Sequence, residues 1–336
     1  MVSKSFRRPF VAVALAGAMA ISAAAQAQQY SVTDLGSTPG GTSSDGLGIN
    51  ASGQVTGFAY TSGTYVTYEH AFLYSNGSMQ DLGTLGGAYS YGYGINASGQ
   101  VTGYAYTSGG YDHAFVYSNG SMQDLGTLGG TYSTGQGINA SGQVTGAAST
   151  NGDAVVHAFV YSNGTMQDLG TLGGTFSYGY GINASGQVTG VASTSGGAQH
   201  AFLYSNGSMQ DLGTLGGTYS YGQGINASGQ VTGYADTSSG AQRAFLYSNG
   251  QMIDLNSEIG SAASLYTLVS GEAINDSGQI VVDGYVDATG QSVAFLLTPT
   301  SPVPLPAAAW LMLSGLGGLG AVARQRKPQG LLRAFA

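Results

Sequence analysis

The sequence contains no cysteine, and charged residues make up only 7% of its 336 residues. The fold therefore owes nothing to disulfide bonds, which is compatible with export without proving it. Positive charge is the scarcest: between residues 28 and 302 the single cation is Arg243, whereas all 16 Asp and Glu residues lie there. So acidic a surface repels phosphate backbones, which argues against a nucleic-acid partner.

Glycine and aromatic residues are abundant instead. The chain has 58 glycines, 23 tyrosines and 11 phenylalanines. A disordered chain would carry fewer aromatic residues and more charge. The composition therefore indicates a β-rich exported protein with enough apolar surface for a large core.

The first 27 residues have the pattern of a secretory signal peptide. Lys4, Arg7 and Arg8 form a basic start, an apolar run covers residues 10–25, and a small-x-small site ends at Ala27. We expect cleavage after Ala27. The alternative is an uncleaved transmembrane anchor, which the clean cleavage site disfavours.

The C-terminal region predicts a stalk and a membrane anchor. Residues 299–306 contain four prolines, which favour an extended linker. Residues 307–323 are uncharged and apolar and predict a short transmembrane helix, and residues 324–336 form a basic cytoplasmic tail. The expected anchoring residues are Trp310 at one interface and Arg324, Arg326 and Lys327 on the cytoplasmic side.

The order of these parts resembles a PEP-CTERM sorting tail of the VPLP variety. The motif is Val303-Pro304-Leu305-Pro306, followed by the apolar helix and the basic cluster, and the resemblance covers residues 303–327. The Pro-Glu-Pro triplet itself is absent, and nine residues follow Lys327. The resemblance implies an exosortase-type membrane protease as a partner. It also implies a protein of a Gram-negative bacterium that is anchored in the membrane or released to the cell surface or exopolysaccharide matrix.

The central region, residues 28–298, consists of six repeats. Each repeat has an Asn-x-Ser-Gly segment whose Asn follows the previous one after 43 to 49 residues, a period typical of propeller blades. An Asp-Leu pair recurs in the same way. The turn asparagines are Asn50, Asn96, Asn139, Asn183, Asn226 and Asn275, and the repeated aspartates are Asp34, Asp81, Asp124, Asp168, Asp211 and Asp254.

One repeat predicts four short antiparallel strands. They are expected at residues 91–95, 101–107, 113–118 and 122–125, separated by Asn-Ala-Ser-Gly, Ser-Gly-Gly and Asn-Gly turns. Residues 126–130 are expected to cross to the next repeat. Alternation gives each sheet one bulky and one small face, so identical sheets can stack.

The two ends of the repeat region predict ring closure. The last repeat ends at residues 294–297 without an Asp-Leu strand, and residues 30–35 are an Asp-Leu strand without a repeat. We therefore predict an all-β, six-bladed β-propeller of four-stranded antiparallel blades, followed by a C-terminal hydrophobic helix. The N-terminal strand closes this ring, with Val32 buried against Phe295 or a neighbour.

With their Gly-Ile-Asn-x-x-Gly and Asp-Leu-Gly segments, the His-Ala-Phe phrases resemble the bacterial extracellular HAF-repeat family. The resemblance spans most of residues 30–297 and implies an exported repeat protein, without a known activity. Arg243 and Val293 replace the histidine in the last two copies, and Asn256 replaces the glycine after the last Asp-Leu pair.

The histidines occupy one position in successive repeats, which argues against a metal site because a ring holds equivalent positions apart. We expect each to bond the repeated aspartate of its own or an adjacent repeat. Calcium in the Asn-x-Ser-Gly turns is disfavoured because only Asp276 adds a carboxylate there. We predict no metal and no cofactor. The histidines are His70, His113, His157 and His200.

The sequence predicts no enzyme. A glycosidase needs two particular carboxylates at a defined separation, and the repeated aspartates are not unique. Glu69, Asp112, Asp153 and Asp236 do not recur, and we expect them in solvated hairpin loops. We therefore predict no catalytic residue, and a hydrolase is the least favoured function.

Two other functions remain open. The first is a structural or adhesive role at the cell surface or in the polysaccharide matrix. The alternative is a carbohydrate-binding module, since tyrosine combines a flat apolar ring with a polar tip suited to sugars. Its candidate ligand-binding residues are the loop tyrosines Tyr65, Tyr68 and Tyr111.

Overall fold

The computed structural model describes residues 33–38, 41, 43–61 and 68–300. The chain divides into two compact units, residues 1–34 and 35–336, and every described strand lies in the second. Several predictions lie outside the described residues: the signal peptide and its cleavage at Ala27, Tyr65, the sorting motif, and the hydrophobic helix with its basic tail.

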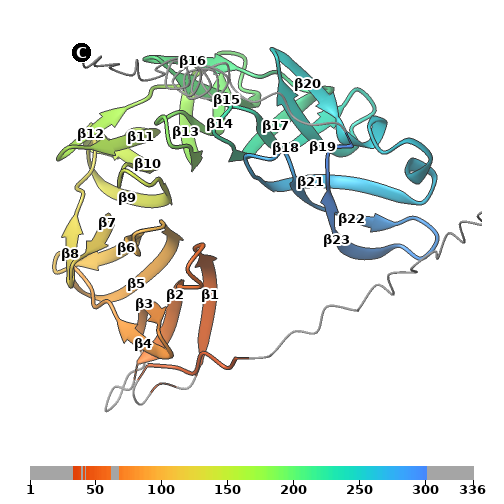
Figure 1. Cartoon of the computed structure of the whole chain (residues 1–336). Coiled ribbons are helices and arrows are strands. Elements are labelled where there is room, and N and C mark those ends of the chain that lie inside the picture. The colour runs from red at the N-terminus through yellow and green to blue at the C-terminus, as the bar shows by residue number, and fades with distance from the viewer. Residues whose placement is uncertain (1–32, 39–40, 42, 62–67, 301–336) are drawn as a thin grey trace, which may run out of the picture. The chain divides into compact units, whose positions relative to one another are not determined.

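The described chain is an all-β structure, as predicted, and its strands follow one another as antiparallel meanders (Figure 1). Within the described ranges no α-helix occurs; the helical residues are the short 3-10 turns η1 (Asn151–Asp153), η2 (Leu255–Ser257) and η3 (Gly260–Ser264). None of the helices described there is long and apolar enough to cross a membrane.

The strands group into six sheets, one per repeat. Sheet 1 comprises β1 (Ser44–Ile49), β2 (Val55–Thr61), β3 (Tyr68–Ser75) and β4 (Ser78–Asp81). Sheet 2 comprises β5 (Gly86–Ile95), β6 (Val101–Thr107), β7 (Asp112–Ser118) and β8 (Ser121–Asp124). Sheet 3 comprises β9 (Gly129–Ile138), β10 (Val144–Thr150), β11 (Val156–Ser162) and β12 (Thr165–Asp168).

The remaining sheets follow the same plan. Sheet 4 comprises β13 (Gly173–Ile182), β14 (Val188–Thr194), β15 (Gln199–Ser205) and β16 (Ser208–Asp211). Sheet 5 comprises β17 (Gly216–Ile225), β18 (Val231–Thr237), β19 (Gln242–Ser248) and β20 (Gln251–Asp254). Sheet 6 has three strands, β21 (Tyr266–Ile274), β22 (Ile280–Val286) and β23 (Gln291–Leu297). Single parallel pairs, Val156 with Phe176 and Gln199 with Tyr219, make sheets 3 to 5 continuous.

The predicted hairpin between the third and fourth strands is confirmed. Asn119 and Gly120 both have positive φ, +52° and +84°, as a two-residue Asn-Gly turn requires. The first strand, however, is longer than predicted, because β5 already begins at Gly86. A Cβ on Gly87 would lie 2.5 Å from Cβ of Tyr106, so the glycines of the predicted crossing segment let β5 approach β6. The same glycine pair opens the first strands of sheets 3 to 5.

Neighbouring sheets pack face to face, with the small face of one against the bulky face of the next. Ala114 and Val116 of sheet 2 share a buried cluster with Val144, Ala148 and Phe159 of sheet 3. Equivalent clusters lie between all five consecutive pairs of sheets. Each four-stranded sheet is thus stabilised by burial against its neighbours, and none forms a core by itself.

A closed ring is not found in the described residues. Among them β23 pairs with β22, and no strand pairing joins sheet 6 to sheet 1. Thr33, Asp34 and Leu35 are not part of a strand, which corrects that part of the predicted segment 30–35. In sheets 1 to 4, by contrast, the corresponding residues do form a strand, which ends at the repeated aspartate before the Leu-Gly pair.

Candidate functional site

In each of the first five sheets the Asn-x-Ser-Gly turn and the Ser-Asn-Gly hairpin lie at the same end of the strands, because alternate turns of a meander share an end. We call it the turn edge. In sheet 2 the side chain of Asn96 shapes it: Oδ1 accepts hydrogen bonds from the backbone N–H groups of Ser98 at 3.1 Å and Gln100 at 3.0 Å. This is the turn chemistry for which asparagine is favoured.

A ladder of asparagine side chains joins the turn edges of successive sheets. Nδ2 of Asn96 donates a hydrogen bond to the backbone carbonyl of Asn139 at 3.0 Å. The same bond recurs at every step along the chain, at 2.9 to 3.2 Å. The ladder fixes one turn against the next. Its five donors are Asn50, Asn96, Asn139, Asn183 and Asn226.

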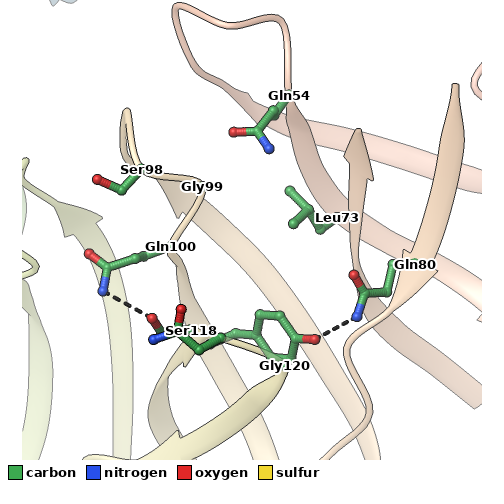
Figure 2. A pocket seen from close by; sticks show the side chains of 10 residues that line it. Gln54, Leu73, Gln80, Ser98, Gly99, Gln100, Ser118 and Gly120 are labelled. Atoms are coloured by element: carbon green, nitrogen blue, oxygen red, sulfur yellow. Dashed lines mark hydrogen bonds between the residues drawn. The ribbon is translucent and has the colours of Figure 1, made fainter. Parts of the chain in front are cut away.

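A pocket of about 250 Å³ lies between the turn edges of sheets 1 and 2 (Figure 2). Within it, Nε2 of Gln80 donates to the hydroxyl of Tyr117 at 2.6 Å, and Nε2 of Gln100 donates to Oγ of Ser118 at 3.3 Å. No lining residue carries a charge. The lining comprises Gln54, Leu73 and Gln80 of sheet 1, and Ser98, Gly99, Gln100, Tyr117, Ser118, Asn119 and Gly120 of sheet 2.

The pocket recurs along the chain. A second pocket, of about 240 Å³, is lined by Ser185, Gly186, Gln187, Tyr204, Ser205 and Asn206, which are the counterparts of residues 98–100 and 117–119. The bond from glutamine to tyrosine between adjacent sheets also recurs, at 2.6 to 2.9 Å. The four pairs are Gln80 with Tyr117, Gln123 with Tyr161, Gln167 with Tyr204 and Gln210 with Tyr247.

The interface between sheets 5 and 6 departs from this pattern. Ile253 stands at the position of the glutamine, and Leu297 stands at the position of the tyrosine. Neither side chain can form the polar pair. The glutamine–tyrosine pair is therefore a feature of the first four interfaces along the described chain.

The lining of the pocket determines what it can do chemically. It offers amides and hydroxyls beside one aromatic ring and the apolar side chain of Leu73. It contains no carboxylate, imidazole or amine, which are the groups on which general acid–base catalysis most often depends. The arrangement suits binding of a neutral ligand that has both polar and apolar surface.

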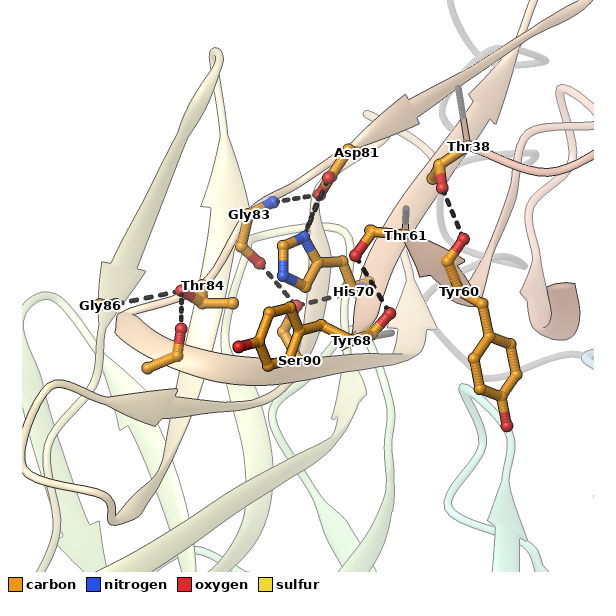
Figure 3. A network of polar contacts seen from close by, with 12 residues as sticks. Thr38, Tyr60, Thr61, Tyr68, His70, Asp81, Gly83, Thr84, Gly86 and Ser90 are labelled. Atoms are coloured by element: carbon orange, nitrogen blue, oxygen red, sulfur yellow. Dashed lines mark hydrogen bonds and ion pairs between the residues drawn. The ribbon is translucent and has the colours of Figure 1, made fainter. Parts of the chain in front are cut away.

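The opposite end of the strands, which we call the connection edge, contains the repeated histidine in sheets 1 to 4; Figure 3 shows His70 with Asp81 in sheet 1. Nδ1 of His70 lies 2.9 Å from Oδ2 of Asp81, and Oδ1 of Asp81 accepts a hydrogen bond from the Gly83 N–H at 2.7 Å. Burial alone would raise the pKa of Asp81, but the bonds from His70 and Gly83 outweigh it and hold this pKa below its ordinary value. The pair thus ties the third strand to the connection that leads to the next sheet.

The same histidine–aspartate pair occurs in the next three sheets. Each pair joins residues of one repeat, at 2.8 to 2.9 Å, so every histidine bonds the aspartate of its own sheet. These pairs are His113 with Asp124, His157 with Asp168 and His200 with Asp211.

Sheet 5 replaces this pair. Asp254 accepts hydrogen bonds from the backbone and side-chain nitrogens of Asn256, at 2.9 and 2.8 Å. The side chain of Asn256 in turn bonds the backbone N–H and C=O of Leu268 in sheet 6, at 2.8 and 2.9 Å. Arg243, at the histidine position, donates to the backbone of Gln242. At the connection edge Asn256 therefore bonds sheet 5 to sheet 6.

The tyrosines predicted as ligand-binding residues do not line the pockets at the turn edge. Tyr111 is in the loop before β7 and is 51% exposed. Tyr68 is the first residue of β3 rather than a loop residue, and its ring lies edge-on to Tyr89 at 5.8 Å between centroids. Tyr68 pairs with Thr61 of β2, so β3 begins earlier than the sequence predicts. The aromatic residue in the pocket is Tyr117, at the opposite edge.

Three of the four non-recurring carboxylates are strand residues, which corrects the loop prediction. Glu69, Asp112 and Asp236 pair in register with the adjacent strand, because the ladder continues up to the turn. Asp153, in η1, accepts hydrogen bonds from Oγ of Ser149 and N–H of Thr131, each at 2.6 Å, and these hold its pKa below the ordinary value. In the described part of the chain no three His, Asp or Glu side chains lie close enough to hold a metal ion.

Half-buried tyrosines form a further polar feature, in β9 and β18. Burial raises the pKa of Tyr132 to about 12, with contributions from the neighbouring Tyr178 and Asp112. Burial likewise raises the pKa of Tyr234 to about 12, and its ring stacks on that of Tyr221 at 4.7 Å. The fold therefore stabilises the neutral phenols.

These tyrosines predict alkaline lability. A pKa raised above 10.0 contributes stability that is fully present below pH 10 and is lost as the pH rises toward about 12. The free energy of unfolding, measured by chemical denaturation, should fall across this range together with the appearance of tyrosinate absorbance. The double variant Tyr132→Phe, Tyr234→Phe should show a shallower fall than Tyr111→Phe, which removes an exposed phenol. Equal slopes in the two variants would contradict the prediction.

Sequence analysis missed the glutamines of the pocket. Gln80, Gln123, Gln167 and Gln210 always precede the repeated aspartate, and Gln54 and Gln100 always follow the turn glycine. An uncharged polar residue that recurs at a fixed position indicates a specific hydrogen bond, so the sequence contained a signal for these glutamines. The partner tyrosine, however, belongs to the next repeat, so the spacing within a single repeat does not indicate the pair.

Comparisons with known proteins yield distant structural similarities. No protein-family profile matches the sequence, and no curated protein matches it. TolB from Acinetobacter baumannii is 15% identical with a TM-score of 0.42, and the match covers 62% of this chain and 53% of TolB. A puromycin-hydrolyzing peptidase from Mycobacterium tuberculosis is 11% identical with a TM-score of 0.45, covering 74% of this chain and 43% of the peptidase. This chain thus spans about half the length of these two proteins.

The Aleuria aurantia lectin is similar at the same level, with 12% identity and a TM-score of 0.35 over 76% of this chain and 92% of the lectin. Similarities of this size assign no activity to the present chain.

Proposed function

We propose that this protein is an exported, non-enzymatic repeat protein with a structural or adhesive role at a bacterial cell surface or in its exopolysaccharide matrix. The observation that carries the proposal is repetition: successive sheets present the same groups at the same edge, including the asparagine ladder and the recurring pocket. Repeated identical sites favour multivalent binding, whereas catalysis needs one particular set of groups.

The proposal includes closure of the six sheets into a propeller. Ile49 in sheet 1 and Leu296 in sheet 6 are 70% and 62% exposed. Their counterparts in the second interface, Ile138 and Val116, pack in one cluster. The face of sheet 6 that points away from sheet 5 and the face of sheet 1 that points away from sheet 2 thus carry the two halves of a sixth interface. Contact between them would bury both.

The start of the second compact unit also supports closure. Gly36 has φ +74°, and its carbonyl accepts a hydrogen bond from Oγ of Ser44 at 2.6 Å. Gly83 has φ +73° and is bonded in the same way by Ser90 at 2.6 Å. Gly83 follows the fourth strand of the preceding sheet. By this correspondence, we propose that the segment before Gly36, which includes Val32, lies beside β23 at the place of the fourth strand that sheet 6 lacks.

The alternative function is a carbohydrate-binding module. The pockets at the turn edge favour it, and binding of the matrix polysaccharide would also explain an adhesive role. The two functions differ in whether the protein recognises sugar or only coats the cell.

The C-terminal tail provides a direct test of the location. Deleting residues 303–327 should release the protein from the cell envelope into the medium, because the motif, the apolar helix and the basic cluster are then all absent. Quantitative immunoblots of envelope and medium fractions measure the distribution. Deleting residues 328–336, which leaves these parts intact, is the matched control and should not move the protein. An unchanged distribution after the first deletion would refute retention through this tail.

A further inference from the structure

We infer that the recurring pocket at the turn edge binds one neutral sugar residue at each of the four interfaces that carry a glutamine–tyrosine pair. The inference rests on the proposed function and deepens it by naming the site and the ligand class. It also moves the site away from Tyr68 and Tyr111, which lie near the connection edge.

The size of the pocket limits the ligand. The pocket volume is about 250 Å³. Pockets for drug-sized ligands start at roughly 300 Å³. One sugar ring fits the available space, whereas a disaccharide would extend out of it. A polysaccharide would therefore present single residues to successive pockets.

The lining has the mixed character that a sugar requires. Leu73, which is partly exposed, provides apolar surface for the C–H groups of a pyranose, and Tyr117, which is only 6% exposed, borders the pocket beside it. Amides and hydroxyls from both sheets surround them and can exchange hydrogen bonds with sugar hydroxyls. Because these side chains are already held by bonds to each other, little side-chain entropy is lost on binding.

The glutamine–tyrosine pair orients one strong donor. The hydroxyl of Tyr117 accepts a hydrogen bond from Nε2 of Gln80, so its own proton remains to be donated. A sugar hydroxyl or ring oxygen is a suitable acceptor. The same orientation is available to Tyr161, Tyr204 and Tyr247, which accept bonds from their glutamines.

Charge selects the neutral class of polysaccharide. No cation lines the pockets, and Arg243 is the single cation between residues 28 and 302, where 16 acidic residues lie. A uronate or phosphate in the pocket would find no positive partner there and would have to approach a protein of net negative charge. Alginate and other anionic polysaccharides are thus expected to be rejected.

The test uses affinity electrophoresis of the full chain in native gels that contain a neutral glucan, galactan or mannan, with an alginate gel for comparison. The blocking variant replaces by leucine the turn serine at each of the four interfaces that carry a glutamine–tyrosine pair, so that an apolar side chain stands where a hydroxyl was. Its matched control replaces the preceding exposed alanine of the same turns by leucine. The serines are Ser98, Ser141, Ser185 and Ser228, and the alanines are Ala97, Ala140, Ala184 and Ala227.

We expect at least one neutral polysaccharide to retard the native protein and the alanine control, and retardation of the blocking variant to be lost. Tyr117→Phe, Tyr161→Phe, Tyr204→Phe and Tyr247→Phe should each weaken binding about two- to tenfold, the effect of one neutral hydrogen bond. Combined, they should weaken it much further because the sites are linked. Tyr74 is the counterpart of these tyrosines in sheet 1 and belongs to none of the four glutamine–tyrosine pairs. Tyr74→Phe should therefore leave binding unchanged.

Three results would overturn the inference: no retardation by any neutral polysaccharide, equal retardation of the blocking variant and its control, or preference for alginate. Circular dichroism and melting temperature establish that each variant is folded. The same variants, followed in envelope fractions, separate this inference from the proposed function. If the protein is retained in the envelope fraction but no neutral polysaccharide retards it, the proposed function stands and the sugar site is wrong.

Discussion

Removing residues 28–36 should lower the melting temperature of the protein by on the order of 10 °C. In the proposed closed propeller these residues lie beside β23, at the place of the missing fourth strand, and hold sheet 6 against sheet 1. Without them, apolar side chains such as Ile49, Leu296 and Val281 stay in solvent at both terminal faces. Loss of their burial amounts to about 5 kcal/mol. A terminal trim of the same length from an unpaired tail would have almost no effect.

The control replaces residues 28–36 by a Gly/Ser segment of equal length, which keeps the chain length but removes Val32, Leu35 and their pairing. It should melt like the deletion. Both variants should also form concentration-dependent oligomers, measured by light scattering, because the edge of β23 and the terminal faces can pair with another copy. A melting temperature that stays within two degrees of the native value, roughly the effect of 1 kcal/mol, would rule out the closing strand.

The sequence was sufficient to predict the strands and their stacking, since both depend on local patterns. The Asn-Gly hairpins require positive φ at both residues, and alternation along β6 and β7 separates a small from a bulky face. The start of β5 was predicted too late, because Gly86 and Gly87 were interpreted as a crossing segment. Their role depends on how closely β6 approaches, which the sequence does not contain.

The candidate site was less accessible to sequence reasoning. The histidine and aspartate of one pair lie in the same repeat, so their recurrence pointed to the bond. The pocket, however, joins Gln80 of one repeat to Tyr117 of the next. Because every residue of the motif recurs, recurrence does not separate residues that line a pocket from residues that only stabilise the fold. Only the packing of neighbouring sheets shows which side chains are in contact. The sequence predicted ligand-binding tyrosines in loops, whereas the aromatic residue in the pocket, Tyr117, lies in strand β7.

Asn139→Ala should destabilise the protein by about 3–4 kcal/mol, because one small buried side chain makes four hydrogen bonds. Nδ2 donates to Oε1 of Gln143 at 2.7 Å and to the backbone carbonyl of Asn183 at 2.9 Å. Oδ1 accepts from the backbone N–H groups of Ser141 and Gln143, each at 3.0 Å. Asn139 is only 5% exposed, so water cannot replace these bonds without opening the turn edge. Chemical denaturation measures the loss as a lower midpoint.

The matched control is Asn275→Ala, with both substitutions compared in the variant that lacks residues 28–36, in which the proposed ring is open. Among the described residues Asn275 makes the same bonds within its own turn at 2.9 to 3.1 Å and donates to no other repeat. It is exposed, and solvent can satisfy the groups that its loss leaves behind. We expect it to cost about 1 kcal/mol. The difference between the two variants isolates the bond between repeats together with its burial. If the two substitutions destabilise equally, the ladder between sheets contributes nothing to the stacking, and the turn-edge pockets are held in place by the apolar clusters alone.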